Sequence, residues 1–389
     1  MPHLFSGLIA FGLATAMLFA GGMVVIHLEQ ITLPSTAPEL FPLKNQGLAF
    51  QRAAARASDV LPLYGSSEIT FPPVPEKASS FFRTAPTDFQ VSPVGHGGTT
   101  SLIVLQKVSA LGSDLRGKKL AISLEPGWLL NPPWWPAYEA NFSLMAASEM
   151  AFGTALDFKL KRAIALRMLE CPSTLKKSPL LEFALRRLAS GRWLDRVVFC
   201  AIWPIGKAET AFLVLQDHFA AFNYIRHEIK PTPRRHPEIL EWPKLIAKVG
   251  NADKIEKGSS MDKQIAPRRG EAVSRIQMNA GPGWKDLELL LRALAEIHAR
   301  PLILSMPIDG RFYDQIGVSR SARESYYQKI RAMAQRYNFA VVEFEQHDED
   351  PTFFDRHMQH VPSRHLTAQS WMFYNRALDD FFHDRSPKG

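Results

Sequence analysis

The longest hydrophobic run of the chain lies at its beginning. Residues 4–26 contain no Lys, Arg, Asp or Glu, and as a helix they extend about 35 Å, enough to cross a hydrocarbon layer about 30 Å thick. We therefore predict a transmembrane anchor over residues 1–27. A cleavable signal peptide is the alternative, but such a peptide needs small residues around its cleavage site, and here Leu18 stands two positions before Ala20.

The pattern changes after the anchor. Residues 28–58 contain spaced prolines followed by the run AFQRAAARASD, for which we expect a stalk and then a connecting helix. Farther along, short apolar runs of strand length alternate with longer amphipathic patterns of helix length. The predicted strands are 60–64, 118–124, 301–306 and 339–344, and the predicted helices are 102–115, 284–298, 321–336 and 367–382.

This alternation predicts an α/β fold with a parallel sheet, in which ligand-binding residues lie at the carboxyl ends of the strands. We expect one such domain over residues 59–389, interrupted by insertions at about 141–280. The first part of the insertion, residues 141–226, has a mainly helical pattern. The second part, residues 227–280, is charged and broken by Pro and Gly.

The net charge of the chain narrows the classes of partner that we expect. Lys and Arg outnumber Asp and Glu by 46 to 38, a net charge of +8, which favours acidic partners or an anionic membrane surface. Many basic residues lie in 159–196. They indicate either a solvated helical face or a surface for anionic lipid headgroups or an acidic protein. The charged insertion lacks the interleaved aromatic residues that stack on bases, so we expect no nucleic-acid binding.

Two further features leave alternatives open. Cys171 and Cys200 are too few for a disulfide scaffold and lack metal-ligand spacing. We expect both to be buried apolar residues, or to pair if the body lies outside the cytoplasm. Basic residues such as Lys44 and Arg52 follow the anchor, so the positive-inside rule does not predict on which side the body lies.

The turn Gly65-Ser66-Ser67-Glu68 directly follows the first predicted strand. A serine there can project from a sharp turn beside backbone N–H groups that would hold an oxyanion. A plain turn or a helix N-cap is the simpler interpretation of the same residues. A serine hydroxyl is a weak nucleophile without a base, so the catalytic interpretation requires a histidine.

His365 is the histidine whose position fits. It follows the last predicted strand and precedes a helix for which we predict Thr367 as N-cap. In a parallel sheet, such a loop can face the end of the first strand, where a histidine can act as a base. The alternative is a loop histidine bonded to solvent or backbone.

These segments also occur in a recognisable order behind a single transmembrane helix. In chain order they are GSSE at 65–68, GGTTS at 97–101, EPGW at 125–128, NFS at 141–143, MPIDGRFY at 306–313, YYQKI at 326–330, and His365 with Trp371. With this order the sequence resembles the DltD family, membrane-anchored proteins of the D-alanine transfer pathway for cell-envelope polymers. The resemblance implies an SGNH/GDSL-hydrolase-like three-layer sandwich with a parallel sheet, a helical insertion and one N-terminal transmembrane helix.

The resemblance also implies roles for individual residues. It makes Ser67, rather than Ser66, the nucleophile and His365 the base, with the backbone N–H groups of Ser67 and Gly98 as oxyanion donors. The family normally has an Asp three residues before the histidine, and this chain has Pro362 there.

The missing carboxylate leaves two alternatives. Asp355 can supply it if the intervening loop folds back, or a backbone carbonyl can orient His365 in a Ser–His dyad. Loss of the orienting group can lower turnover by about 10⁴-fold. We place no oxyanion asparagine from the sequence; Asn131 is merely nearby.

The function that the resemblance implies is D-alanyl transfer to a cell-envelope glycopolymer, teichoic acid or an analogous polysaccharide, through a serine acyl-enzyme. Its implied partners are a membrane-bound O-acyltransferase and a phosphopantetheinylated D-alanyl carrier protein, and its body is expected outside the bacterial cytoplasmic membrane. The chemistry requires no metal or diffusible cofactor. Alternatives are an SGNH esterase, thioesterase or O-acetyltransferase, and a non-catalytic membrane scaffold that recruits the carrier protein through the basic surface of residues 159–196.

Overall fold

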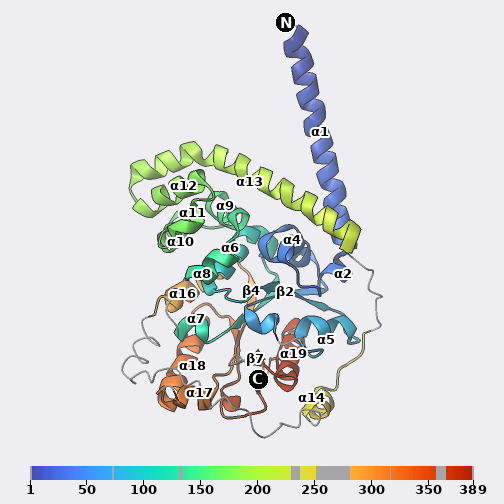
Figure 1. Ribbon diagram of the computed structural model, residues 1–389, viewed down its shortest axis with the longest axis vertical. Helices are drawn as coiled ribbons and strands as arrows, with labels where there is room; N and C mark the ends of the chain where they lie inside the picture. The colour runs from blue at the N-terminus through green and yellow to red at the C-terminus, as the bar shows by residue number, and fades with distance from the viewer. Residues whose placement is uncertain are drawn as a thin grey trace.

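The structure is a computed structural model that describes residues 2–71, 74–130, 135–228, 237–250, 281–315, 317–355 and 365–387. Helix α1 (Pro2–Ile31) projects away from the rest of the protein (Figure 1). It is long and apolar enough to cross a membrane, and its large side chains, such as Phe5 and Met17, are exposed. The helix therefore fits the predicted single-pass anchor.

A five-stranded parallel sheet forms the centre of the body. Its strands are β1 (Val60–Gly65), β2 (Gln90–Gly95), β3 (Lys119–Leu124), β4 (Arg300–Ser305) and β5 (Ala340–Glu343), in the order β2-β1-β3-β4-β5. Four of them agree with the sequence prediction. The sequence pattern does not predict β2, because Pro93 interrupts its apolar residues. An edge strand such as β2 tolerates a proline.

Helices cover both faces of the sheet. On one face Tyr64, Ile122 and Ile303 share a core with α6 (Ser101–Leu111), α16 (Pro282–Glu296) and α18 (Arg320–Gln335). On the other face Leu63, Ala121 and Leu302 share a core with α5 (Ala78–Thr84) and α19 (Ala368–Phe382). Alternate residues of each strand thus pack against opposite helical layers. The predicted α/β class with a parallel sheet is confirmed.

The segment after α1 packs against the body. It contains α2 (Leu33–Thr36), α3 (Pro42–Gln46) and α4 (Ala49–Arg56), the last of which is the expected connecting helix. Lys44 is buried, and its ammonium donates to the carbonyl of Ala37 at the end of α2. Gln51 of α4 is also buried and donates to the carbonyls of Lys44 and Gly47. Residues expected to form a stalk are therefore folded around α4.

The first part of the insertion is helical, as predicted. Two short helices, α7 (Gly127–Leu130) and α8 (Trp135–Asn141), precede it. Its own helices are α9 (Leu144–Phe152), α10 (Phe158–Met168), α11 (Pro172–Leu175), α12 (Pro179–Ser190) and α13 (Trp193–Glu228). Of the charged part the structure describes residues 227–228 and 237–250, which include α14 (Trp242–Gly250). The Trp242 indole donates to Asp379 at 2.8 Å. Residues 229–236 and 251–280 lie outside the described residues.

Neither cysteine forms a disulfide. Cys171 is buried, as expected, but Cys200 is exposed on α13. The expectation of two buried cysteines is therefore wrong for Cys200, because the side of α13 that carries it faces away from the body.

Candidate functional site

The serine turn lies where the strand order reverses. From β1 the chain passes to β2 on one side and then crosses to β3 on the other, so β1 and β3 are neighbours at the switch point. In open α/β sheets ligands bind in the crevice at the carboxyl ends of such strands. The turn at residues 65–68 ends β1, and Glu125 directly follows β3.

Two glycines allow the ends of β1 and β2 to come close together. Gly65 and Gly95 are register partners. A Cβ atom on Gly95 would lie 2.0 Å from the carbonyl oxygen of Gly65, and a Cβ on Gly65 would lie 2.4 Å from Oε1 of Glu68. A side chain at either position would therefore separate the serine turn from the glycine-containing loop after β2.

The two serines of the turn have different surroundings. Ser66 is only 1% exposed, and its Oγ accepts the backbone N–H of Gly98 at 3.1 Å. Ser67 begins the 3₁₀ helix η1 (Ser67–Ile69) and is half-buried. A Cβ on Gly97 would lie 3.9 Å from the Cβ of Ser67. Ser66 thus joins the turn to the glycine loop, and Ser67 lies beside that loop with part of its surface accessible.

Asn141 of α8 holds the glycine loop in place. Its amide nitrogen donates to the carbonyls of Gly97 at 3.1 Å and Ala137 at 2.9 Å, and its oxygen accepts the hydroxyl of Thr99 at 3.1 Å. Both ends of the amide are therefore used to position the loop. Gly98 itself has a φ of +82°, and a Cβ there would lie 2.7 Å from the Cβ of Ala137, so only glycine fits this position.

The sequence alone predicts no role for Asn141. The only signal was its place in the NFS motif at 141–143, since its partners at 97 and 99 lie more than 40 residues away. Asn131, the nearby asparagine noted from the sequence, lies outside the described residues.

His365 lies on the short strand β7 (His365–Leu366), which pairs with β6 (Phe354–Asp355) in an antiparallel ladder. In this register the backbone of Asp355 is directly opposite that of His365. Strand β7 also lies beside η1, which begins at Ser67. The backbone therefore brings the three segments of the predicted triad together, while Pro362 lies outside the described residues.

The N-cap of α19 fixes the chain just after His365. The Thr367 hydroxyl accepts the N–H of Ser370 at 3.3 Å and donates to the carbonyl of Thr352 at 2.6 Å. The predicted N-cap is thus confirmed. Trp371 lies on α19, four residues after Thr367, and is fully buried in the core between α19 and the sheet.

Comparison with known proteins agrees with this arrangement. A family model described as DltD protein matches residues 37–383. The chain belongs to the DltD family. It is 24% identical to Protein DltD of Bacillus subtilis (strain 168) over 394 aligned residues, covering 94% of this chain and 95% of that protein. It is also 24% identical to Protein DltD of Staphylococcus aureus (strain NCTC 8325 / PS 47) over 348 aligned residues, covering 85% and 84%.

The match to the DltD family includes every site segment described above, and the resemblance inferred from the motifs is confirmed.

Two other motif segments stabilise the loop after β4. Asp348 accepts the N–H of Ile308 at 2.8 Å and the hydroxyl of Tyr327 at 2.6 Å, and burial raises the pKa of Asp348 to about 7. The MPIDGRFY and YYQKI motifs therefore hold one side of the crevice in shape.

A buried carboxyl lies beneath the serine turn. Glu68 is fully buried, and its two oxygens accept the N–H of Ser66 at 2.9 and 3.0 Å. Burial and the neighbouring Glu125 raise the pKa of Glu68 to about 8. Burial also lowers the pKa of nearby Lys77 to about 8. The turn that carries both serines is thus supported by a group that titrates near neutral pH.

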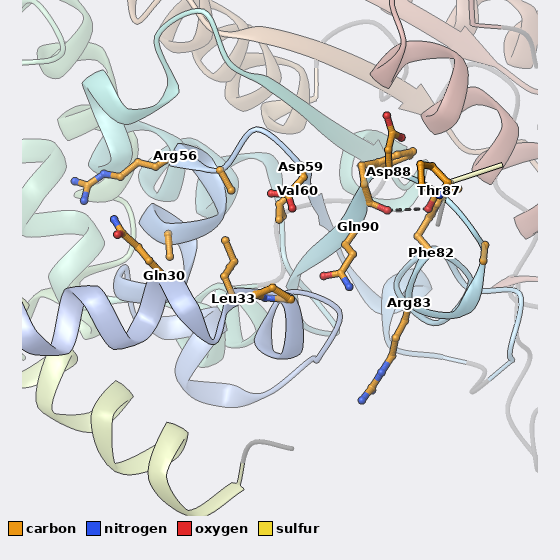
Figure 2. A pocket seen from close by; sticks show the side chains of 16 residues that line it. Gln30, Leu33, Arg56, Asp59, Val60, Phe82, Arg83, Thr87, Asp88 and Gln90 are labelled. Carbon is orange, nitrogen blue, oxygen red and sulfur yellow. Dashed lines mark hydrogen bonds between the residues drawn. The ribbon is translucent and has the colours of Figure 1, made fainter. Parts of the chain in front are cut away.

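A pocket formed by described residues lies at the amino ends of strands β1 and β2. Its volume is about 470 Å³, and it is lined by the first residues of β1 and β2, Val60 and Gln90, together with Gln30 and Leu33 near the end of α1 (Figure 2). The serine turn is at the opposite end of β1, so this pocket takes no part in the chemistry of Ser67. Across the described ranges, no three His, Cys, Asp or Glu side chains come together as a metal site.

Proposed function

We propose that this protein transfers D-alanyl groups to a cell-envelope glycopolymer, teichoic acid or an analogous polysaccharide, through an acyl-enzyme on Ser67. The observation that carries the proposal is the meeting of three segments at the switch point. These are η1 with Ser67, the loop with Gly98, and β7 with His365. Membership of the DltD family supports the nature of the acyl group.

In the first half-reaction, His365 takes the proton of the Ser67 hydroxyl as its oxygen attacks the carbonyl carbon of a D-alanyl ester or thioester. The backbone N–H groups of Ser67 and Gly98 stabilise the resulting oxyanion. The bond to the leaving alcohol or thiol then breaks, and His365 returns the proton to it. The product is a D-alanyl ester on Ser67.

In the second half-reaction, a hydroxyl group of the polymer attacks the acyl-serine while His365 takes its proton. The ester bond to Ser67 breaks, Ser67 regains the proton, and D-alanine is left as an ester on the polymer. Asp355, opposite His365 in the ladder, is the group we assign to orient the imidazole and to stabilise its charged form. The chemistry needs no metal or diffusible cofactor.

Ser67 is a better nucleophile candidate than Ser66 for a physical reason. Ser66 is buried and its Oγ already accepts the Gly98 N–H, whereas Ser67 is half-buried at the start of the element that lies beside β7. For the Gly98 N–H to stabilise the oxyanion, the Ser66 hydroxyl must rotate away when substrate binds. Ser66 therefore acts as a positioning residue for the loop.

The proposal includes the cellular location of the body and its partner proteins. The body would lie on the outer side of the bacterial cytoplasmic membrane, held by α1. The acyl group would come from a phosphopantetheinylated D-alanyl carrier protein by way of a membrane-bound O-acyltransferase. Membership of the DltD family supports this setting, and the apolar α1 supports the anchorage.

The test is the ester-linked D-alanine content of purified envelope polymer from cells that carry each variant at equal protein level. Ser67→Ala is expected to reduce it to the level of cells without the protein. Ser66→Ala is the matched control and is expected to retain most of it. Unchanged D-alanine in Ser67→Ala cells would overturn the catalytic proposal. Labelled D-alanine and labelled acetate, fed in parallel, separate D-alanyl transfer from an esterase or O-acetyltransferase activity.

One observation favours a second candidate, a non-catalytic scaffold. In this structure the expected oxyanion donor, the Gly98 N–H, is already engaged by Ser66. A scaffold would recruit the carrier protein through the basic surface of residues 159–196, although Arg186 and Arg187 there pair with Glu182 and Asp195. It predicts that Ser67→Ala is silent and that charge reversal at Arg186 and Arg187 is not.

A further inference from the structure

Helix α13 is unusual because its polar groups face the protein. Of its 36 residues, the buried line consists of Phe199, Gly206, Thr210, Asp217 and Ala221, spaced as one helical face. A Cβ on Gly206 would lie 2.3 Å from the ring of Phe152, so α13 packs closely on α9 at this point.

Ion pairs and hydrogen bonds fasten this buried side along its length. Lys207 pairs with Glu149 of α9 at 3.2 Å. Asp217 accepts the N–H groups of Leu48 and Ala49 at the start of α4, both at 2.7 Å. The helix is therefore held flat across the body at two distant points.

The outward side of α13 is apolar. Between residues 197 and 220 none of the exposed residues is charged, and only Gln216 among them carries an amide or hydroxyl group. Lys207, which is partly exposed, is turned to its ion pair with Glu149. Ile205 is 60% exposed, Phe212 60% and Phe219 49%. A helix on the surface of a water-soluble domain has the opposite pattern, with charged and polar residues outward. A continuous exposed apolar stripe of this kind marks an interaction surface.

The position of α1 relative to α13 indicates what the apolar surface contacts. His218 of α13 pairs with Glu29 near the end of α1 at 2.7 Å. Glu29 is three residues beyond Ile26, the end of the predicted apolar span, which is about 4.5 Å along a helix. Figure 1 shows α13 lying across the side of the body from which α1 projects, at a steep angle to α1. If α1 crosses a bilayer, α13 lies at the level of its surface.

We propose that α13 is an in-plane interfacial helix whose outward side, from Val197 to Ala220, enters the boundary between headgroups and acyl chains of the membrane that α1 crosses. Exposed arginines at its two ends, Arg192 and Arg196 before the stripe and Arg226 after it, suit anionic headgroups. A second crossing by α13 is excluded, because its bonded side would carry α4 and α9 into the hydrocarbon layer.

This arrangement attaches the body to the membrane at two places, α1 and α13. A single helix would let the body rotate about the chain that follows it. A second, flat contact fixes the orientation of the sheet, and with it the height of the serine turn above the lipid surface.

The test uses the full chain in vesicles of phosphatidylcholine and phosphatidylglycerol. A nitroxide is attached to one cysteine at a time, and its collisions with oxygen, which concentrates in lipid, are compared with those of a nickel chelate, which stays in water. The labelled variants are Ile205→Cys, Phe212→Cys and Phe219→Cys in a Cys200→Ser background. The control is Ile239→Cys, because Ile239 is 98% exposed and lies outside α13, three residues before α14 begins.

The proposal predicts several-fold fewer nickel-chelate collisions and more oxygen collisions at 205, 212 and 219 than at 239. Chelate collisions equal to those at 239 would show a water-facing helix. Exclusion of both reagents would show that another protein covers it. Either result overturns the proposal. Native Cys200, exposed on the same helix, gives the same measurement in the unsubstituted chain, so an effect of the substitutions on folding cannot explain the result.

Discussion

The backbone N–H of Gly98 donates to the Oγ of Ser66 at 3.1 Å, so the expected oxyanion donor is held in place by the neighbour of the expected nucleophile. Removal of the Ser66 hydroxyl leaves this N–H available. We expect Ser66→Ala to lose one hydrogen bond, at a cost of about 0.5–1.5 kcal/mol in the free energy of unfolding, and to keep D-alanylation. Thermal unfolding of the purified variant and the D-alanine content of the polymer check both parts. Loss of D-alanylation with an unchanged fold would make Ser66 the catalytic serine.

Gly98→Ala tests the glycine loop. Alanine at a φ of +82° is strained, and its methyl group would lie 2.7 Å from the Cβ of Ala137. Gly117→Ala is the matched control, because Gly117 has a φ of +69° but nothing within 4 Å of its Cβ position. The strain common to both costs about 1–3 kcal/mol, and only Gly98→Ala is expected to abolish D-alanylation. Equal loss of activity in the two variants would mean that backbone strain, and not the position of this N–H, limits the reaction.

Asp355→Asn tests the role assigned to Asp355, the register partner of His365 in the ladder. An amide cannot stabilise the imidazolium that forms during transfer, so turnover is expected to fall by as much as about 10⁴-fold. The rate of D-alanyl transfer to polymer by purified protein is the measurement. Asp88→Asn makes the same chemical change just before β2, at the end of that strand opposite the glycine loop, and should leave the rate unchanged. An unaffected rate in Asp355→Asn would favour a Ser–His dyad oriented by a backbone carbonyl.

Glu68→Gln tests the buried carboxyl beneath the serine turn. The native pKa of Glu68 is raised from 4.5 to about 8, so the folded protein retains a proton that the unfolded chain loses above about pH 4.5. The contribution of Glu68 to stability is therefore complete at low pH and is lost as the pH rises through 8. Glutamine is neutral at every pH and keeps an acceptor for the Ser66 N–H.

The expected result is that the melting temperature of the wild type falls more steeply between pH 5 and pH 8.5 than that of Glu68→Gln. In free energy of unfolding, the loss in the wild type exceeds that in Glu68→Gln by an amount on the order of a few kcal/mol, since one pKa unit corresponds to about 1.4 kcal/mol. Glu324→Gln, at a partly exposed position on α18, is the control and should follow the wild type. Parallel curves for wild type and Glu68→Gln would show that Glu68 is ionised in the folded protein.

The sequence predicted the elements whose signal is local. Strands β1, β3, β4 and β5 are short apolar runs of the right length, and the cap at Thr367 follows from the residues next to it. Strand β2 could not be predicted in this way, because Pro93 breaks its pattern and only its place at the sheet edge makes the proline tolerable.

The parts of the site that the sequence did not predict depend on long-range contacts. Asn141 donates a hydrogen bond to a loop more than 40 residues away. The pairing of Asp355 with His365 joins two strands of only two residues each, which are too short to leave a sequence pattern. The same holds for α13. Its composition indicates an apolar helix, but only the packing shows that the polar groups face the body and that Phe212 faces outward.

The site of acylation tests the account most directly. Purified full-length protein would be treated with a D-alanyl thioester in the absence of polymer, digested, and its serine-turn peptide fragmented in a mass spectrometer. The account predicts a D-alanyl ester on Ser67, absent from Ser67→Ala and present in Ser66→Ala. A D-alanyl ester on Ser66, or no ester on either serine in a preparation that still transfers D-alanine to polymer, would contradict it.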